Sequence, residues 1–359
     1  MTDLLIVITV VLILVIIIQI SKASEYVSVL KGKEKSVQQS DKVNAWLLIL
    51  FLIFGLIGIY ICQELLKGKL LPVAASVQGA AIDHMIIVTG IITAFVFFVT
   101  QILLFYFGFR YHNKPGRKAK YLPDNDPLEI TWTAITALVM LVLTIFGLKE
   151  WFEITGPAPK NAMVVEVTGK QFAWLFRYPG KDGVLGRKDY KLIDPAKDNP
   201  LGQDWSDQAN DDDVVSSGVM HLVVDRPVRL IINSQDVIHD VGMPYFRLKM
   251  DAMPGIPTTL WFTPTITTAQ MIKKTGDPDF VYELACDQLC GQGHFTMRAT
   301  IIVETQQQFN QWEASQESQY KIAMADLNPA STPDVKDTIG TKTSLPPSDS
   351  TKAKVAFAK

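Results

Sequence analysis

Four long apolar runs near the N-terminus constrain this chain more than any other feature of its sequence. An α-helix needs about 20 predominantly apolar residues to cross a bilayer, and every run approaches that length. The sequence therefore predicts a membrane-anchored helical part, followed by a polar globular part after the last run. The runs are Leu4–Ile20, Trp46–Cys62, Met85–Phe109 and Ile130–Leu148.

The first run has two interpretations. A secretory signal peptide carries positive charge before its apolar stretch. Met1 to Asp3 contain neither Lys nor Arg, and the positive charges lie after the run instead. We therefore expect a retained helix with its N-terminus on the outer side, which gives four spanning helices in all.

Lysine and arginine counts orient these helices. The segments Ser21–Ala45 and Arg110–Pro127 each contain five Lys or Arg residues, whereas Gln63–Asp83 contains two. Because Lys and Arg accumulate in cytoplasmic loops, both rich segments are expected to be cytoplasmic. The region after Leu148 is then exported to the outer side of the membrane. The formal net charge of −2 gives no global field that would indicate nucleic acid.

Beyond the fourth run the apolar pattern changes. Ile154–Ala162, "ITGPAPKNA", contains Pro and Gly, which end helices, and is predicted to be a hinge. Short β-branched segments follow, among them "MVVEVTG", "PVRLIIN" and "ATIIVET". Several short strands without helices between them indicate an antiparallel β-sandwich or barrel. The predicted fold class is thus membrane-anchored α plus all-β.

These boundaries divide the chain into six parts. The predicted ranges are 1–83 for a first transmembrane hairpin, 84–153 for a second, 154–162 for the hinge, 163–305 for the β domain, 306–327 for a surface helix and 328–359 for a disordered tail. Inside the β domain, residues 179–218 are polar, and a solvated insertion is the favoured interpretation. The alternative is that its aspartates attract a basic electron-transfer partner. These aspartates are Asp204, Asp207 and Asp211–Asp213.

A short segment of the β domain, "CDQLCGQGHFTM", concentrates soft ligands: Cys286, Cys290, His294 and Met297. Covalent attachment of a c-type haem needs C-x-x-C-H, which the chain lacks. A structural zinc site would have no use for methionine, whereas thiolate, imidazole and thioether together favour copper. A disulfide between the two cysteines remains an alternative on these residues alone.

A second histidine weakens the disulfide interpretation. His239, in "SQDVIHDVGMPYF", follows the predicted strand "VRLIINS". Loops at strand ends can meet at one pole of a β-sandwich, so His239 could lie beside the cysteine loop. Two thiolates, two imidazoles, one thioether and one backbone carbonyl would then suffice for two copper ions bridged by both sulfurs. Such a rigid pair suits electron transfer more than bond chemistry.

At this point the chain resembles a known family, subunit II of the haem–copper cytochrome c oxidases. Four stretches match in family order, "PLEITWTAIT", "GKQFAWLFRY", "DVIHDVGMPYFRLKMDAMPG" and "CDQLCGQGHFTM", and the resemblance covers Met85–Glu304. It implies a cupredoxin-like domain with a dinuclear copper centre, CuA. The implied ligands are His239, Cys286, Cys290, His294, Met297 and the main-chain carbonyl of Gln288.

The chain departs from the family pattern at several positions. The family usually has Glu at the position of Gln288, where the carboxylate also reaches a magnesium ion at the border with subunit I, so magnesium binding is left in doubt. Phe172 replaces the tryptophan at which electrons arrive, with Trp174 close by; buried aromatic residues of an ordinary strand explain Trp174 equally well. Thr136 stands where proline is common, and the first hairpin is an addition.

Glu129, in "PLEITW", has two compatible interpretations. An acidic residue in the first turn of a helix complements the helix dipole. The resemblance also implies a position at the mouth of a proton-uptake channel in subunit I.

The resemblance implies an electron relay with no catalytic residue of its own. Electrons would come from cytochrome c or a cytochrome c domain and pass to haem in subunit I, where oxygen reduction and proton pumping occur; this chain would carry no haem. Subunit III would be a further partner, and the added hairpin resembles versions associated with alternative complex III. Two rivals are weaker. Nitrous oxide reductase has the same ligand order but needs a large propeller domain, and a membrane-anchored copper chaperone would not need all these ligands.

Overall fold

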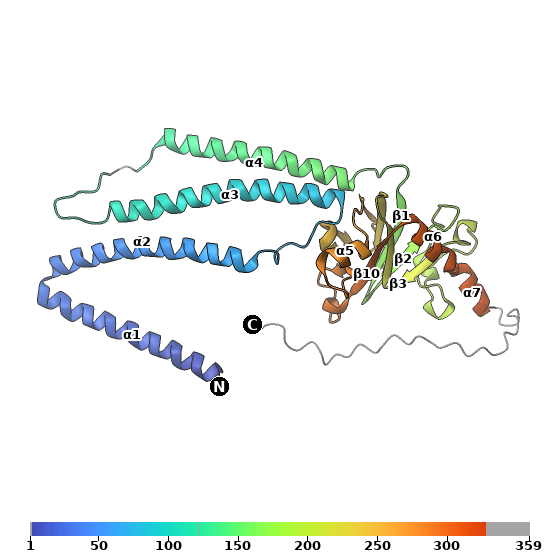
Figure 1. The fold of residues 1–359 in the computed structure, drawn as a ribbon, viewed down its shortest axis with the longest axis horizontal. Coiled ribbons are helices and arrows are strands. Elements are labelled where there is room, and N and C mark those ends of the chain that lie inside the picture. The colour runs from blue at the N-terminus through green and yellow to red at the C-terminus, as the bar shows by residue number, and fades with distance from the viewer. Residues whose placement is uncertain (1, 122, 328–359) are drawn as a thin grey trace. The chain divides into compact units, whose positions relative to one another are not determined.

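The structure is a computed structural model that describes residues 2–121 and 123–327. The predicted disordered tail, 328–359, lies outside the described residues. Figure 1 shows long helices followed by a β-rich domain and two short C-terminal helices.

The N-terminal part is helical, as predicted. Among the described residues, three helices are long and apolar enough to cross a membrane: Glu34–Leu66, Val77–Arg110 and Asp126–Thr155. A further helix precedes them, and its crossing of a membrane stays a prediction. The helices are α1 (Thr2–Lys31), α2 (Lys33–Leu66), α3 (Val77–Arg110) and α4 (Asp126–Thr155).

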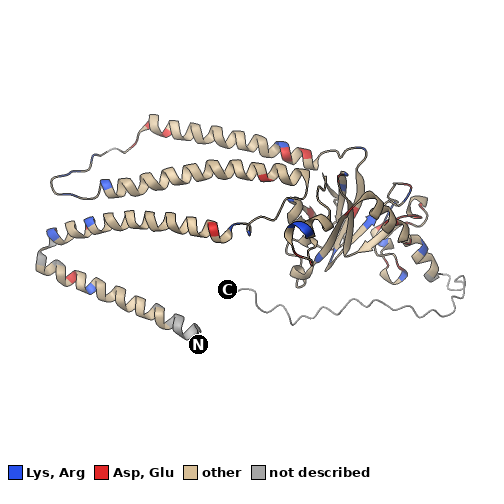
Figure 2. Ribbon diagram, viewed as in Figure 1, with Lys and Arg blue, Asp and Glu red and all other residues tan. Residues whose placement is uncertain are grey.

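The polar segment between the first two apolar runs differs from expectation. The sequence suggested a loop over Ser21–Ala45, but the segment is helical apart from Gly32, whose φ of 83° is unfavourable for other residues. Lys, Glu and Gln in this segment are good helix formers, so polarity alone does not end a helix. Charged residues lie mainly toward the ends of α2, α3 and α4, while their long middle stretches carry almost none (Figure 2).

The β domain consists of two five-stranded sheets, in the orders β3-β2-β1-β5-β8 and β4-β10-β9-β6-β7. Apolar side chains from both sheets are buried, including Val165, Leu230, Leu222 and Ile301. The strands are β1 (Met163–Lys170), β2 (Ala173–Tyr178), β3 (Val214–Ser217), β4 (Val219–Val223), β5 (Val228–Ser234), β6 (His239–Met243), β7 (Leu248–Ala252), β8 (Thr258–Phe262), β9 (Tyr282–Cys286) and β10 (Arg298–Glu304).

The prediction of a purely antiparallel domain is wrong in two places. β1 pairs with β5 in parallel, and β10 pairs with β4 in parallel. Parallel neighbours need a long connection. The chain provides one in both cases, because strands and the 179–218 segment intervene between β1 and β5, and most of the domain lies between β4 and β10.

Helical elements interrupt the β domain more often than the sequence suggested. α5 (Thr268–Thr275) lies between β8 and β9 and begins with a reciprocal cap between Thr267 and Gln270, a signal that the sequence analysis missed. The expected single surface helix over 306–327 is two helices, α6 (Gln306–Ser315) and α7 (Gln319–Leu327). Short 3-10 turns are η1 (Tyr190–Leu192), η2 (Pro195–Lys197), η3 (Gln208–Asn210), η4 (Pro244–Phe246) and η5 (His294–Thr296).

The polar segment after β2 is a compact unit with its own buried side chains. Residues 179–214 group with residues 317–327, and Leu201, Gln203 and Asn210 are buried within the segment. A backbone bond joins Gln319 N to Asp213 O at 2.9 Å. The segment is therefore more ordered than a solvated insertion.

Most aspartates of this unit hold its turns. Asp204 and Asp207 both pair with Arg187, and the Asp212 carboxylate accepts the amides of Lys181 and Asp182. Hydrogen bonds from Ser206 lower the pKa of Asp204, and the Arg187 amide lowers the pKa of Asp207. Local structure thus accounts for these acids, and their proposed attraction of a basic partner stays a prediction.

Candidate metal centre

Pairing of β6 with β9 brings the predicted ligands together. The strands are antiparallel, and Val241 lies opposite Cys286. His239 is the first residue of β6, not part of a preceding loop as the sequence suggested. Cys286 ends β9, and the remaining ligands lie on the connection from β9 to β10. The Cys286 amide closes this connection by donating to Met297 O at 3.1 Å. Sheet register therefore determines which side chains meet.

The two cysteines face each other without a bond. Their Sγ atoms are 3.8 Å apart and both thiols are free, whereas a disulfide requires about 2.05 Å. The disulfide interpretation of the sequence does not describe this structure. Two buried, unbonded sulfurs at this separation can instead face a common metal site.

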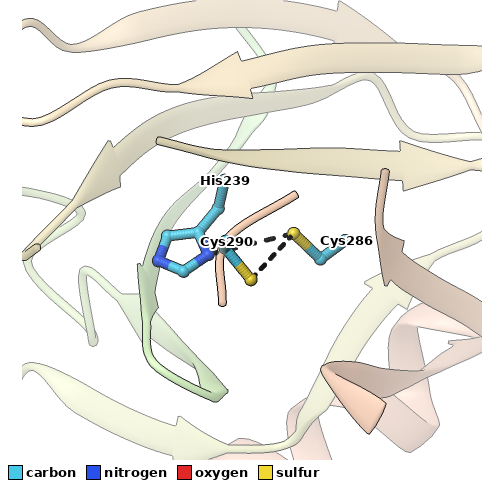
Figure 3. A group of neighbouring side chains, drawn as sticks. All are labelled: His239, Cys286 and Cys290. Atoms are coloured by element: carbon cyan, nitrogen blue, oxygen red, sulfur yellow. Dashed lines mark hydrogen bonds between the residues drawn. The ribbon is translucent and has the colours of Figure 1, made fainter. Parts of the chain in front are cut away.

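Each histidine points its Nδ1 atom at a different sulfur. His239 Nδ1 lies 3.8 Å from Cys286 Sγ, and His294 Nδ1 lies 3.6 Å from Cys290 Sγ. Figure 3 shows the first of these contacts and the sulfur pair. His239, Cys286 and Cys290 offer ligand atoms that all lie within 4.8 Å of one another.

Two weaker donors complete the set. Met297 Sδ lies 3.9 Å from Cys290 Sγ, and the Cys286 thiol donates to the main-chain oxygen of Gln288 at 3.1 Å. The Gln288 side chain is exposed, so this residue can contribute through its backbone. All six predicted donors thus lie around the sulfur pair, and thiolate, imidazole and thioether fit a soft metal such as copper.

Burial controls the protonation of the site. His239 and Met297 are fully buried, and both cysteines are nearly so. Burial, together with hydrogen bonding to the neighbouring Cys286, raises the pKa of Cys290 to about 11. Since metals bind thiolates, metal binding must release the Cys290 thiol proton. The metal cation then compensates the negative charge of the buried thiolate.

A hydrogen-bond network that the sequence analysis missed fixes the first histidine. His239 Nε2 lies 2.7 Å from Asp236 Oδ1, which leaves Nδ1 free to face the sulfur. The other Asp236 oxygen accepts the Gln171 amide at 2.7 Å, and Gln171 Nε2 donates to Cys290 O at 2.6 Å. The network ties three separate loops together. An aspartate three residues before a ligand histidine was the available sequence signal.

The two aromatic candidates take different places. Phe172 is 38% exposed, and its ring covers Gly293, where an added Cβ would lie 2.6 Å from Phe172 Cδ2. Trp174 is fully buried, with its ring centroid 5.9 Å from that of His239. Phe172 therefore lies at the surface over the ligand loop, and Trp174 packs behind His239. Glu129 lies apart from this site, in the first turn of α4.

Comparisons with known proteins identify the family of this chain. The family model "Cytochrome C oxidase subunit II, periplasmic domain" matches residues 163–305, and "Cytochrome C oxidase subunit II, transmembrane domain" matches residues 65–149. The alternative cytochrome c oxidase subunit 2 of Bradyrhizobium diazoefficiens is 37% identical over 238 residues, which is 66% of this chain and 80% of that protein. The chain belongs to the cytochrome c oxidase subunit II family.

Two further relatives extend the comparison. Cytochrome c oxidase subunit 2 of Thermostichus vulcanus is 27% identical over 315 residues, covering 73% of this chain and 82% of that protein. The crystal structure of the periplasmic domain of a Bradyrhizobium japonicum subunit II is 25% identical, covers 46% of this chain and 98% of that chain, and has a TM-score of 0.30. The transmembrane match begins at residue 65 and ends at residue 149, so α1 and most of α2 precede it, as expected for an added hairpin.

Replacing Asp236 by Ala should weaken copper binding by about 10- to 100-fold, because His239 would lose the partner that orients its ring. Competition of the copper-loaded protein with a chelator measures this affinity. Asp236→Asn retains an acceptor and serves as the control. Equal affinity for the Ala variant and the wild type would show that Asp236 does not orient the ligand.

Proposed function

We propose that this chain is the electron-accepting subunit of a respiratory cytochrome c oxidase, with a dinuclear copper centre of the CuA type. The observation that carries the proposal is the convergence of four further donors on two unbonded sulfurs 3.8 Å apart. His239, Cys286, Cys290, His294, Met297 and the carbonyl of Gln288 would hold two copper ions. Bound copper would supply one-electron chemistry at this site.

The chain's own residues prepare the site for electron transfer. Asp236 holds the His239 ring, and Gln171 holds the Cys290 carbonyl. Ligands held in place by packing and hydrogen bonds need little rearrangement when charge arrives. The neutral Gln288 side chain is a poorer magnesium ligand than a carboxylate, so we propose no magnesium contact from it.

Electrons would enter across an apolar surface around the ligand loop. Phe172, Leu289 and Phe295 are 38%, 78% and 76% exposed, which suits the apolar centre of a docking surface. Phe172 would receive electrons from cytochrome c or a cytochrome c domain, with Trp174 packed behind. Haem in subunit I would accept these electrons. We infer two further partners: subunit III, and alternative complex III, which would contact the added hairpin.

The proposed topology is multi-pass in a bacterial inner membrane. Three apolar helices and the transmembrane family match support anchoring. We infer that α1 also crosses, which gives four spans and places the copper domain on the periplasmic face. The buried, multiply tethered ligands suit a resident metal better than the exchangeable one of a chaperone.

The purified protein should bind two copper ions per chain, and its mixed-valence form should show the hyperfine pattern of one electron shared between two copper nuclei. Cys286→Ser should abolish this pattern because it removes a bridge. Met297→Leu should keep it and shift the reduction potential, since an axial thioether tunes potential. Metal analysis and electron paramagnetic resonance make the measurements. One copper per chain, or identical behaviour of both variants, would contradict the assignment.

Glu129 is proposed to serve proton uptake in subunit I as well as the start of α4. Its Oε1 accepts the Asn125 amide at 3.3 Å, while the Asn125 side chain caps Leu128 N. The capping contact alone does not require a charged side chain.

Substitution can separate these two roles. Glu129→Gln keeps a capping oxygen but removes the acid, so a proton role predicts slower oxidase turnover in this variant with unchanged copper content. Glu129→Ala removes both functions. If Gln turned over normally and only Ala were slow, Glu129 would have the helix-capping role alone.

A further inference from the structure

The segment between the first two spans and α3 is bonded to the copper-bearing domain. Ala75 N donates to Tyr245 O at 2.8 Å, and Thr265 N donates to Ala75 O at 2.8 Å. The buried Ser76 hydroxyl donates to Phe246 O at 2.8 Å and accepts the Gly79 amide. The start of α3 is therefore fixed against the turn η4, which directly follows the histidine-bearing strand β6.

Arg247 forms the charged part of this attachment. Its Nε and Nη2 atoms donate to the two carboxylate oxygens of Asp83, on α3, at 2.7 and 3.1 Å. The same guanidinium donates to the backbone oxygens of Pro72 and Pro244. The Arg247 side chain is only 7% exposed. A partly buried, two-pronged Arg–carboxylate pair of this kind is both strong and specific in orientation.

The backbone of Arg247 is adapted to this contact. Its φ is 58°, in the left-handed region that favours glycine. A residue with a Cβ atom is strained in this conformation. Helix-to-domain contacts made by the guanidinium offset this strain, which indicates a role that glycine could not fill.

The β6–β7 hairpin connects Arg247 to the metal centre. Met243 pairs with Leu248 at the end near Arg247, and His239 pairs with Ala252 at the other end. Four strand steps separate these ends, roughly 14 Å at the usual rise. β6 pairs with β7 on one side and with β9 on the other, which makes this ribbon stiff. The contact between η4 and α3 therefore sets the position of His239 relative to α3.

We propose that Arg247, through its pair with Asp83, is a positioning residue for the electron step that leaves the copper centre. The proposal rests on the proposed electron-relay function. The Arg247 guanidinium bonds to Asp83, Pro244 and Pro72, none of which is a proposed metal ligand. It holds the copper domain at a fixed height and angle to α3, and thereby to any acceptor bound to the membrane helices. Electron transfer falls off steeply with distance, so a small tilt of the domain slows this step.

A second contact, between β8 and α4, also attaches the copper domain to the membrane helices. Trp261 Nε1, on β8, donates to Glu153 O near the end of α4 at 2.7 Å. Loss of the Arg247 contact would therefore leave the domain attached through Trp261, the covalent hinge and the bonds of Ala75 and Ser76, but with its orientation to α3 less firmly held. The copper site would keep its ligands while its relation to the acceptor changed.

The test uses the complete oxidase complex carrying Arg247→Gln, Arg247→Gly or Asp83→Asn. Arg247→Gly suits the backbone conformation and keeps the variant foldable if Gln does not. Arg298→Gln is the matched control, since Arg298 pairs with Glu283 on the same sheet and is 58% exposed. Copper content, the copper spectrum, donor-to-copper electron transfer and copper-to-acceptor electron transfer are measured separately in each complex.

The expected result is a selective loss. Copper content, spectrum and electron arrival should match the wild type, while the copper-to-acceptor step slows severalfold, because electron transfer falls off steeply with distance. The double variant Arg247→Gln/Asp83→Asn should be no slower than Arg247→Gln alone, because the ion pair is already absent in that single variant. An unchanged copper-to-acceptor rate in Arg247→Gly would overturn the proposal. Loss of copper from the wild-type complex would overturn the proposed function instead.

Discussion

Antiparallel hydrogen bonding between β6 and β9 is the constraint on which the metal centre depends. It places Val241 opposite Cys286 and so brings His239 beside a cysteine loop that lies far along the chain. Because a slip of one residue would turn each side chain to the other face of the sheet, the same bonds set His239 against Cys286. The register of β6 against β9 therefore determines both the sheet and the position of His239 in the site.

Burial and a second layer of hydrogen bonds turn this proximity into a rigid site. Asp236 and Gln171 connect the loop after β1, the start of β6 and the cysteine loop, and Phe172 covers the glycines of the ligand loop. Trp174 fills the space behind His239. Rigid geometry suits a centre that gains and loses an electron without making or breaking bonds.

The sequence predicted the apolar helices and the ligand motif well, but it did not predict which strands and side chains pair in the fold. The apolar runs predicted three of the spanning helices, and the soft-ligand motif predicted donors that the structure brings together. Parallel pairing of β1 with β5 was missed because local periodicity does not report strand partners. Asp236 and Arg247 were also missed, since their roles arise from contacts with residues distant in sequence. The Ser21–Ala45 segment was misjudged because charge pattern indicates solvent exposure, not the absence of a helix.

X-ray absorption at the copper edge of this chain, purified and loaded with copper, tests the central claim most directly. The account predicts that each copper has sulfur neighbours from both cysteines, one imidazole nitrogen and a nearby second copper. A spectrum with no copper–copper scattering, or with only nitrogen and oxygen neighbours, would contradict it. Such a result would mean that the two unbonded sulfurs do not bridge a pair of metals.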